Sequence, residues 1–237
     1  MLVKTKAIVI STLKFQEKSL IVKCFTQSHG LKSYFVRDAF SGKKNNQKIA
    51  YFQSLSILEI EAVHKNKGTL EHFKEIKTAI PFQTIPLDIV KSTMVLFLSE
   101  ILHHAIHEEE KNDDLFQYLE AALQWLDTHS EISNFHLILM LEITKFLGFY
   151  PDTTDQNLPF FDMNEGVFSL FQAMSSLSEH QSDLLKKLID LKLDSEQKVF
   201  QVAERQILLK ILIDYYSFHL DGFKKPKSLE ILREIFS

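Results

Sequence analysis

The chain has 237 residues, of which 45% are hydrophobic and 24% charged, a composition that indicates a globular protein and excludes a disordered one. Cys24 is its only cysteine, so the chain cannot form an internal disulfide or a zinc site built from thiolates. Residues 1–80 contain 14 of the 27 Lys and Arg but 6 of the 31 Asp and Glu, a balance of +8, whereas residues 81–237 carry −12. A small cationic domain of this kind favours polyanions, and nucleic acid first among them.

The first 80 residues are predicted to form a β-sheet. Val, Ile, Phe and Thr recur there with a period close to two, which is typical of strands. Turn residues such as His29-Gly30 separate five such runs, over residues 5–15, 19–27, 31–40, 49–63 and 70–77. Because no amphipathic helix of useful length interrupts them, we expect a closed or partly open five-stranded barrel of the OB type.

After Pro81 and Pro86 the apolar period becomes helical. Helices are predicted over residues 87–107, from Asn112 to about 126, and over 134–147, 182–191, 197–220 and 227–236. Residues 152–170 are irregular, with a hairpin of 159–162 and 167–170 across Asn164-Glu165-Gly166. The sequence therefore predicts an α+β multidomain protein: an OB-fold nucleic-acid-binding domain over residues 1–80 and an all-α helical domain over 81–237, with the irregular insertion near 152–170.

The sharpest local signal is a basic segment between the third and fourth predicted strands. It places Arg37, Lys43, Lys44 and Lys48 in one loop, flanked by aromatic residues that include Tyr34, Phe35, Phe40, Tyr51 and Phe52. Cations beside aromatic rings are what sequence-tolerant binding of single strands uses, although a solvated loop whose aromatics belong to the core gives the same pattern. With the +8 balance, we predict a DNA-binding site at these four residues together with Lys32 and Lys14.

The sequence gives no positive evidence for catalysis. It has no phosphate-binding Gly-rich loop and no nucleophile motif. His103 and His107 have the i, i+4 spacing of metal ligands, but a helix end that favours cations explains them equally well. The acidic residues Glu108–Glu110 and Asp113-Asp114 are interpreted as a solvated loop. We therefore expect a non-enzymatic protein without cofactor or metal, located in the cytoplasm, since neither a signal peptide nor a membrane-spanning run is evident.

Several segments together resemble the RecO family of bacterial recombination mediators. They are the opening run 5–10, Glu17-Lys-Ser-Leu-Ile-Val22, Phe25-Thr26 with Gly30, the basic segment 35–44, residues 51–60 and Phe146-Leu-Gly-Phe-Tyr-Pro151. Two departures stand out. Relatives often carry four cysteines for zinc after the last of these segments, where this chain has aromatic residues, and Asp38 replaces a small residue in the basic loop.

The resemblance implies a DNA repair and recombination mediator that acts without catalytic turnover in the RecF pathway. Such a protein binds single- and double-stranded DNA, anneals complementary strands covered by single-stranded DNA-binding protein (SSB), and with RecR helps to load RecA. The resemblance also implies that the protein is located in the cytoplasm in association with the nucleoid. The resemblance also implies that the helical domain binds the C-terminal tail of SSB, and Lys145, Arg205 and Lys210 are candidate cations for that contact. If the resemblance holds, aromatic packing replaces zinc in residues 152–169.

Three rival hypotheses remain open at this point. A generic OB-fold single-strand binder with a helical dimerisation domain would bind DNA without annealing SSB-coated strands. A metal-dependent hydrolase would use His103, His107 and the nearby carboxylates. A protein-only adaptor would have no affinity for bare DNA.

Overall fold

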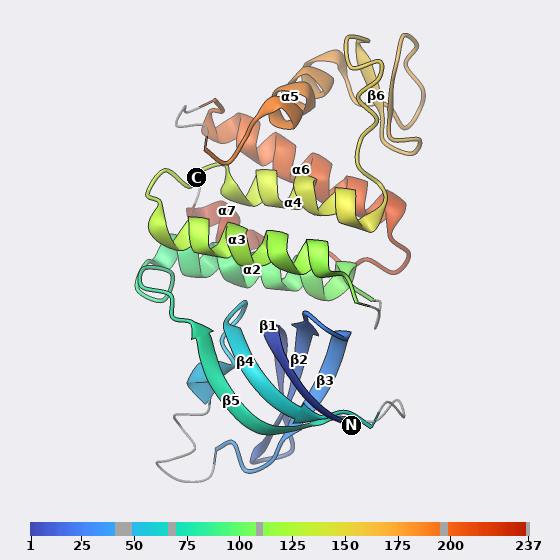
Figure 1. Cartoon of the computed structure of the whole chain (residues 1–237). Helices are drawn as coiled ribbons and strands as arrows, with labels where there is room; N and C mark the ends of the chain where they lie inside the picture. Colours follow the sequence, from blue (N-terminus) through green and yellow to red (C-terminus); the bar gives the residue numbers. More distant parts are fainter. Residues whose placement is uncertain (41–48, 66–69, 108–110, 195–198, 236–237) are drawn as a thin grey trace. The chain divides into compact units, whose positions relative to one another are not determined.

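The computed structural model describes residues 1–40, 49–65, 70–107, 111–194 and 199–235. The chain forms two compact units, Met1–Thr128 and His129–Ser237 (Figure 1), and each is described by itself. The first unit contains the predicted sheet and the first two predicted helices, so the helices that follow residue 80 are divided between the two units. No described helix is both long enough and apolar enough to cross a bilayer.

Five antiparallel strands form the sheet of the first unit, as the sequence predicts: β1 (Leu2–Phe15), β2 (Ser19–Thr26), β3 (Gly30–Val36), β4 (Ile57–Val63) and β5 (His72–Ile80). The prediction is wrong over residues 49–56, because 49–51 form a helical turn and the strand begins only at Ile57. Phe52 and Leu55 are nevertheless buried in the core, which explains why the segment has the apolar content of a strand.

The strand order is β3-β2-β1-β4-β5, so β3 and β5 are the two edges of the sheet. The edges meet at one parallel bridge between Tyr34 and Glu71. There the Phe35 N–H donates to the Glu71 carbonyl at 2.9 Å, and the Glu71 N–H donates to the Ser33 carbonyl at 2.8 Å. The described residues form no further ladder between β3 and β5, so the α+β class is confirmed but the sheet is not closed as a barrel.

One cluster of buried side chains forms the core of this sheet. The buried side chains are mostly small and branched, with the rings of Tyr34 and Phe52 among them. Phe73 stacks on Tyr34 with a centroid distance of 4.1 Å and an interplanar angle of 15°. Cys24 is fully buried in this core, and burial raises the pKa of its thiol, as expected for a small hydrophobic residue.

Two helices complete the first unit: α2 (Ile89–Ala105), which packs against β1, and α3 (Asp113–Thr128). Asp88 caps α2, because its carboxylate accepts the Val90 and Lys91 N–H groups. Phe116 of α3 contacts Phe25 of β2 at a centroid distance of 5.9 Å. These contacts fix both helices to the sheet.

The second unit contains α4 (Phe135–Leu147), the hairpin β6 (Phe160–Asp162) and β7 (Val167–Ser169), α5 (Glu179–Asp190), α6 (Val202–His219) and α7 (Leu229–Ile235). Figure 1 shows α4 and α6 side by side, and the Tyr216 hydroxyl on α6 donates to the Met140 carbonyl on α4 at 2.8 Å. Gly148 ends α4 in the left-handed conformation at φ 82°, as its position before Pro151 predicts. Helix α5 begins earlier than predicted, because Ser178 and Gln181 form a capping box.

The predicted hairpin of the 152–170 segment is present, and aromatic rings pack around it. Phe161 contacts Phe168 at a centroid distance of 4.9 Å and Tyr215 at 5.6 Å, and Tyr215 contacts His219 at 4.4 Å. Phe149 in turn stacks on His219, with an interplanar angle of 8°. Aromatic packing therefore connects this insertion to α6, at the position where the resemblance replaces cysteines with aromatic residues.

Candidate nucleic-acid interface

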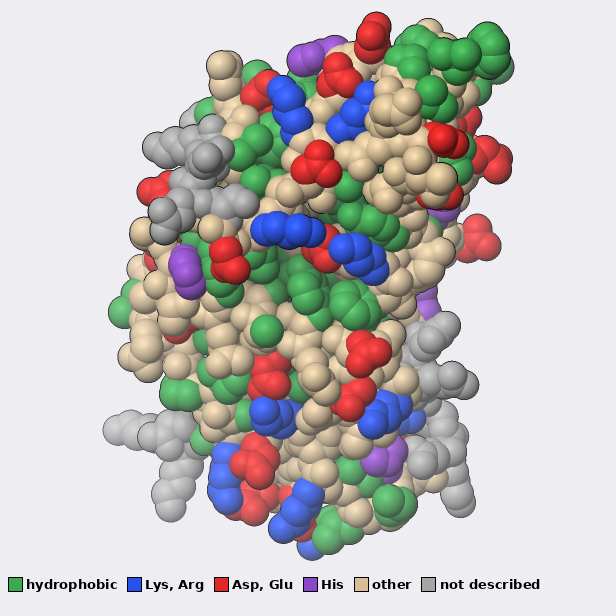
Figure 2. Space-filling model, turned by 45° about the horizontal axis from the view of Figure 1, so that its top comes forward, with side chains coloured by type: hydrophobic (Ala, Val, Ile, Leu, Met, Phe, Trp, Pro, Cys, Tyr) green, Lys and Arg blue, Asp and Glu red, His purple; other side chains and the backbone are tan. Residues whose placement is uncertain are grey.

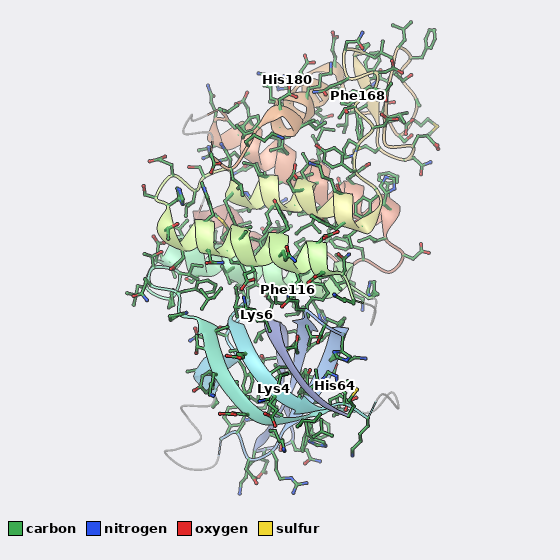
Figure 3. All side chains as sticks on the ribbon, in the orientation of Figure 1. Lys4, Lys6, His64, Phe116, Phe168 and His180 are labelled. Carbon is green, nitrogen blue, oxygen red and sulfur yellow. The ribbon has the colours of Figure 1, made fainter. Side chains whose placement is uncertain are left out.

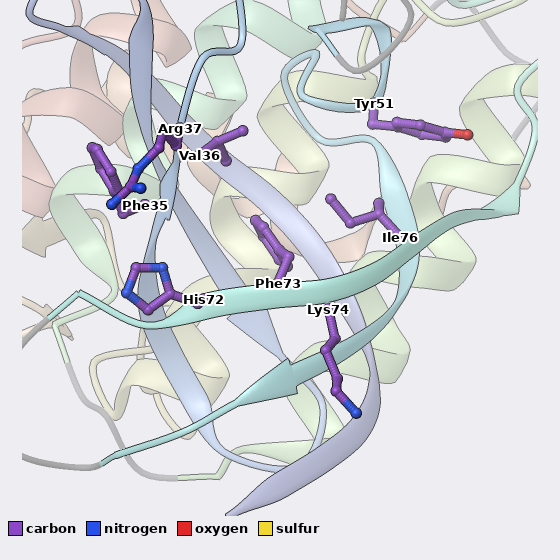
Figure 4. A pocket seen from close by; sticks show the side chains of 8 residues that line it. All are labelled: Phe35, Val36, Arg37, Tyr51, His72, Phe73, Lys74 and Ile76. Atoms are coloured by element: carbon purple, nitrogen blue, oxygen red, sulfur yellow. The ribbon is translucent and has the colours of Figure 1, made fainter. Parts of the chain in front are cut away.

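A groove opens between β3 and β5, where the two edge strands separate beyond the Tyr34–Glu71 bridge (Figure 4). Its volume is about 310 Å³, and we call it the β3–β5 groove. Eight side chains line it: Phe35, Val36, Arg37, Tyr51, His72, Phe73, Lys74 and Ile76. The groove thus combines apolar, aromatic and cationic groups at the edge of an OB-like sheet.

Strand alternation explains how these side chains come together. At the end of β3, buried Val36 follows half-buried Phe35, and the exposed Arg37 begins the turn after the strand. On β5, half-buried Phe73 lies between the exposed His72 and Lys74. In Figure 4, Phe73 points into the groove, and Lys74 points away from it. The open edges therefore place rings inside and cations at the rim.

Among the predicted DNA-binding residues that the structure describes, Arg37 alone lines this groove. Its side chain is exposed and makes no ion pair or hydrogen bond with the described residues. The next residue, Asp38, has φ 53°, a left-handed conformation that asparagine, aspartate and above all glycine tolerate. Asp38 thus adopts a backbone conformation that a glycine at this position would also tolerate. Lys43, Lys44 and Lys48 lie outside the described residues.

Lys14 lies close to this end of β3, whereas Lys32 does not. Lys14 is exposed with its ammonium 5.5 Å from the centre of the Phe40 ring, and Phe15 contacts Phe35 at a centroid distance of 6.1 Å. Lys32 lies within β3, four residues before Val36 at its end, which separates Lys32 from the end of the strand by about 13 Å. The structure therefore groups Arg37 with Lys14 and leaves Lys32 apart.

Several other cations of the sheet are held in ion pairs. Lys4 and Lys74 each lie 3.4 Å from a carboxylate oxygen of Glu61, and Lys6 lies 2.7 Å from Glu120 on α3. Figure 3 shows Lys6 within β1 on the side of Phe116 and α3, with Lys4 nearer the start of the strand. Burial opposes ionisation of Glu61, but the hydrogen bonds from Lys4 and Lys74 lower its pKa. The +8 balance thus overstates the charge that the sheet presents to a polyanion.

Figure 2 shows the same mixture on one face of the molecule, where Lys and Arg side chains stand beside Asp and Glu. A face with both signs interspersed attracts DNA less than a single-sign field would. Local groups of cations near aromatic rings, such as the rim of the β3–β5 groove, therefore matter more for binding than the total charge.

The sequence did not single out His72 and Lys74, which share the groove with Arg37. The sequence signal that could have identified these two residues is the alternation of His72, Phe73 and Lys74, which puts two polar residues on one face of the strand and a ring on the other. That His72 and Lys74 line the same groove as Arg37 depends on the Tyr34–Glu71 bridge, which joins residues 37 positions apart.

Next to the β3–β5 groove, Tyr34, His64 and Glu71 form a buried polar cluster that sequence reasoning missed. The Tyr34 hydroxyl and the His64 Nε2 are 2.8 Å apart, and both side chains are nearly inaccessible. Burial, and secondarily the neighbouring His29, lower the pKa of His64. The Glu71 carboxylate accepts the Lys65 N–H at 2.8 Å, so this cluster fixes the approach of the two edge strands.

His103 lies in the last turn of α2 and contacts the sheet. His103 Nδ1 lies 3.3 Å from the Ser11 hydroxyl, and burial, followed by the positive charge of Lys23, lowers the pKa of His103. The described residues contain no group of three or more His, Cys, Asp or Glu side chains that could hold a metal ion. Glu108–Glu110 lie outside the described residues.

The three cations predicted for a partner site in the helical part do not form one cluster. Lys145 in the last turn of α4 contacts Glu142 at 2.7 Å and lies 4.4 Å from the centre of the Tyr150 ring. Arg205 donates to the Phe200 carbonyl at 2.7 Å, and burial, followed by the positive charge of Arg205, lowers the pKa of His136 at the start of α4. Lys210 is exposed on α6, rotated by about 140° from Arg205 about the helix axis.

The sequence as a whole matches two family models, Recombination protein O N terminal over residues 1–82 and Recombination protein O C terminal over residues 86–230. The chain belongs to the RecO family. It is 74% identical to DNA repair protein RecO of Flavobacterium johnsoniae over 237 residues and 70% identical to that of Flavobacterium psychrophilum over 238, with full coverage of both chains.

A more distant relative, DNA repair protein RecO of Christiangramia forsetii, is 42% identical over 238 residues, again with full coverage. The resemblance identified from the sequence is therefore confirmed, and membership of the family supports a role in DNA repair. The names of these relatives describe repair proteins rather than enzymes.

Proposed function

We propose that this chain is a non-catalytic DNA repair and recombination mediator that binds DNA through its N-terminal sheet. In this proposal it anneals complementary strands covered by SSB and, with RecR, helps to load RecA in the cytoplasm. The observation that carries the proposal is the β3–β5 groove, a cationic and aromatic opening at the edge of an OB-like sheet in a member of the RecO family.

The physical basis of annealing is the neutralisation of two polyanions on one surface. Exposed cations near one end of the sheet, namely Lys14, Lys18 and Arg37, can contact phosphates of adjacent strands and reduce the repulsion between them. Such a step needs no nucleotide and no metal. The aromatic rings beside these cations favour strands whose bases are exposed.

The experiment measures single-stranded DNA affinity across a salt series, for the wild type and for the variant K14E/K18E/R37E. Single strands lose about 0.7 log units of affinity per log unit of salt for each phosphate contact. Loss of three contacts should therefore flatten the slope by about 2. The matched control K187E/K224E/K227E places the same reversals on exposed residues of the second unit and should retain the wild-type slope.

Annealing of SSB-coated complementary strands is the second readout. The variant K14E/K18E/R37E should anneal these strands more slowly than the wild type, whereas the control variant K187E/K224E/K227E should anneal them at the wild-type rate. Equal slopes for both variants would contradict a DNA site on this surface. Binding without annealing would favour the generic single-strand binder, and absence of wild-type binding at moderate salt would favour the protein-only adaptor.

The proposal also includes binding of the C-terminal tail of SSB by the helical unit. Lys145, Arg205 and Lys210 point to different parts of the helical unit, so each is tested by its own charge reversal. A tail peptide labelled with a fluorophore should lose affinity for only those variants whose cation contacts it. A tail that binds all three variants as tightly as the wild type would exclude these cations.

A further inference from the structure

The rings of the β3–β5 groove divide into two kinds. Phe73 is stacked on Tyr34 and lies 5.7 Å from Phe52, so its ring belongs to the core. Phe35, by contrast, meets Phe15 and His72 almost perpendicularly, at interplanar angles of 84° and 86°. Among the described residues no ring stacks in parallel on Phe35, Tyr51 or His72, and all three line the groove.

The floor of the groove is apolar. Val36, Phe73 and Ile76 line it, and the Tyr34–Glu71 bridge ends it on one side. Its volume of about 310 Å³ lies at the lower end of the range for small-molecule sites, a size that suits one flat ring system. These three floor side chains offer no hydrogen-bonding groups, so they cannot read the edge of a base.

The rim carries the charge that a phosphodiester requires. Arg37 has no partner among the described residues. Lys74 is paired with Glu61 at 3.4 Å, but 59% of its side chain is exposed, and an exposed ion pair of this length contributes little stability. A phosphate can therefore replace Glu61 as the partner of Lys74 at small cost.

We propose that the β3–β5 groove binds one unstacked nucleobase of single-stranded DNA. The base lies against Phe35 and His72 above Phe73, and the flanking phosphates contact Arg37 and Lys74. This inference rests on the proposed function and adds the mode of recognition: duplex DNA, whose bases are paired and stacked, cannot fill the groove. Because the floor offers no donors or acceptors, the subsite accepts any base.

The test compares oligo-dT with an abasic oligomer of equal length, which carries the same phosphates and no bases. The variant Phe35→Leu removes the ring and keeps an apolar side chain. Stacking on one ring corresponds to about a 5- to 150-fold difference in affinity. We expect Phe35→Leu to lower the affinity for oligo-dT within that range, without changing its salt slope or the affinity for the abasic strand.

The control is Phe171→Leu, the same substitution at a side chain of the second unit that is 78% exposed. It should change neither affinity. Equal effects of Phe35→Leu on both strands, or no effect on either, would overturn the base subsite while the proposed function stands, because the wild type still binds. No binding of either strand by the wild type would overturn both.

A crosslinking experiment on the unaltered protein avoids any effect of substitution on folding. Oligo-dT containing a single 5-iododeoxyuridine is bound to the wild type and irradiated, and the crosslinked peptides are identified by mass spectrometry. Crosslinks to Phe35, Tyr51 or His72 support the subsite. Crosslinks confined to other parts of the chain contradict it.

Discussion

Asp127 connects the sheet of the first unit to its helices, and its replacement should be strongly destabilising. The carboxylate at the end of α3 accepts three backbone N–H groups from the segment after β5: Gln83 at 2.8 Å, Thr84 at 2.8 Å and Ile85 at 2.9 Å. The Thr84 hydroxyl donates to the Asp127 carbonyl, and the Lys91 ammonium donates to the same oxygen at 3.2 Å. One side chain thus satisfies every N–H of a three-residue turn.

The magnitude follows from what Asp127→Ala leaves behind. The Ile85 N–H is buried, and a buried donor without a partner costs about 1–3 kcal/mol. The other two donors are partly exposed and can reach water, so each loses about 0.5–1.5 kcal/mol. The expected loss in the free energy of unfolding is therefore about 2–6 kcal/mol. Asp127→Asn should also lower the free energy of unfolding, because the NH₂ group of asparagine would face a backbone N–H donor instead of accepting from it.

The assay is urea unfolding at pH 7, followed by the fluorescence of Trp125, the only tryptophan, two residues from Asp127. Burial opposes ionisation of Asp127, but the backbone donors lower its pKa. The stabilisation is therefore complete above the ordinary pKa of Asp, about 3.9, and is lost as the pH falls through the lower folded value.

The control is Gln124→Ala on the same helix, where the exposed side chain should contribute within about 0.5 kcal/mol. An Asp127→Ala variant within 1 kcal/mol of the wild type would refute the reasoning, because it would mean that the turn finds other partners.

Two further predictions concern the second unit. Burial, followed by the charge of Arg205, lowers the pKa of His136 to about 3, so between that value and 6.5 the unfolded chain binds the proton and the folded chain does not. From His136 alone, stability is complete above pH 6.5 and should fall by ~2 kcal/mol from pH 7.5 to 5.0 in urea unfolding; His136→Gln should remove this part of the decline and leave the parts from His64 and His103. Gly166→Ala at φ 71° would place a Cβ 2.8 Å from the Tyr215 hydroxyl, whereas Gly222→Ala at φ 74° has nothing within 4 Å. We expect a loss of about 1–2 kcal/mol at Gly222 and a loss larger by about 1–3 kcal/mol at Gly166 in thermal unfolding, and equal losses would contradict the clash.

The sequence predicted the elements better than their contacts. Period-two alternation identified all five strands of the sheet, and the Gly148 and Pro151 signals gave the end of α4 correctly. The helical turn at 49–51 was missed, because a buried turn and a buried strand need the same apolar side chains. Leu55, buried at φ 56°, is an example: its apolar character is visible in the sequence and its left-handed backbone is not.

The site was predicted only in part for a related reason. Arg37 and the aromatic character around it follow from local sequence, whereas the pairing of Lys6 with Glu120 joins residues 114 positions apart. Alternation shows which neighbouring residues of one strand lie on opposite faces, but the sequence does not contain the register between β3 and β5. The grouping of Arg37 with His72 and Lys74 is a property of the fold alone.

These ion pairs limit how steeply DNA binding by the described sheet can depend on salt. Lys4, Lys6 and Lys77 are each paired with a carboxylate, and Lys32 has a partner as well. Burial lowers the pKa of Lys23, which lies near His103. The exposed cations that remain are Lys14, Lys18, Arg37 and Lys65, with Lys74 as a fifth if a phosphate replaces Glu61.

Five contacts at about 0.7 log units each give a slope of about −3.5 for single strands. The sequence balance of +8 would suggest a steeper dependence. A measured wild-type slope near −3.5 would mean that the described sheet accounts for the phosphate contacts. A steeper slope would require further cations, and the predicted contacts of Lys43, Lys44 and Lys48 would then supply them, since they belong to the segment that begins at Arg37.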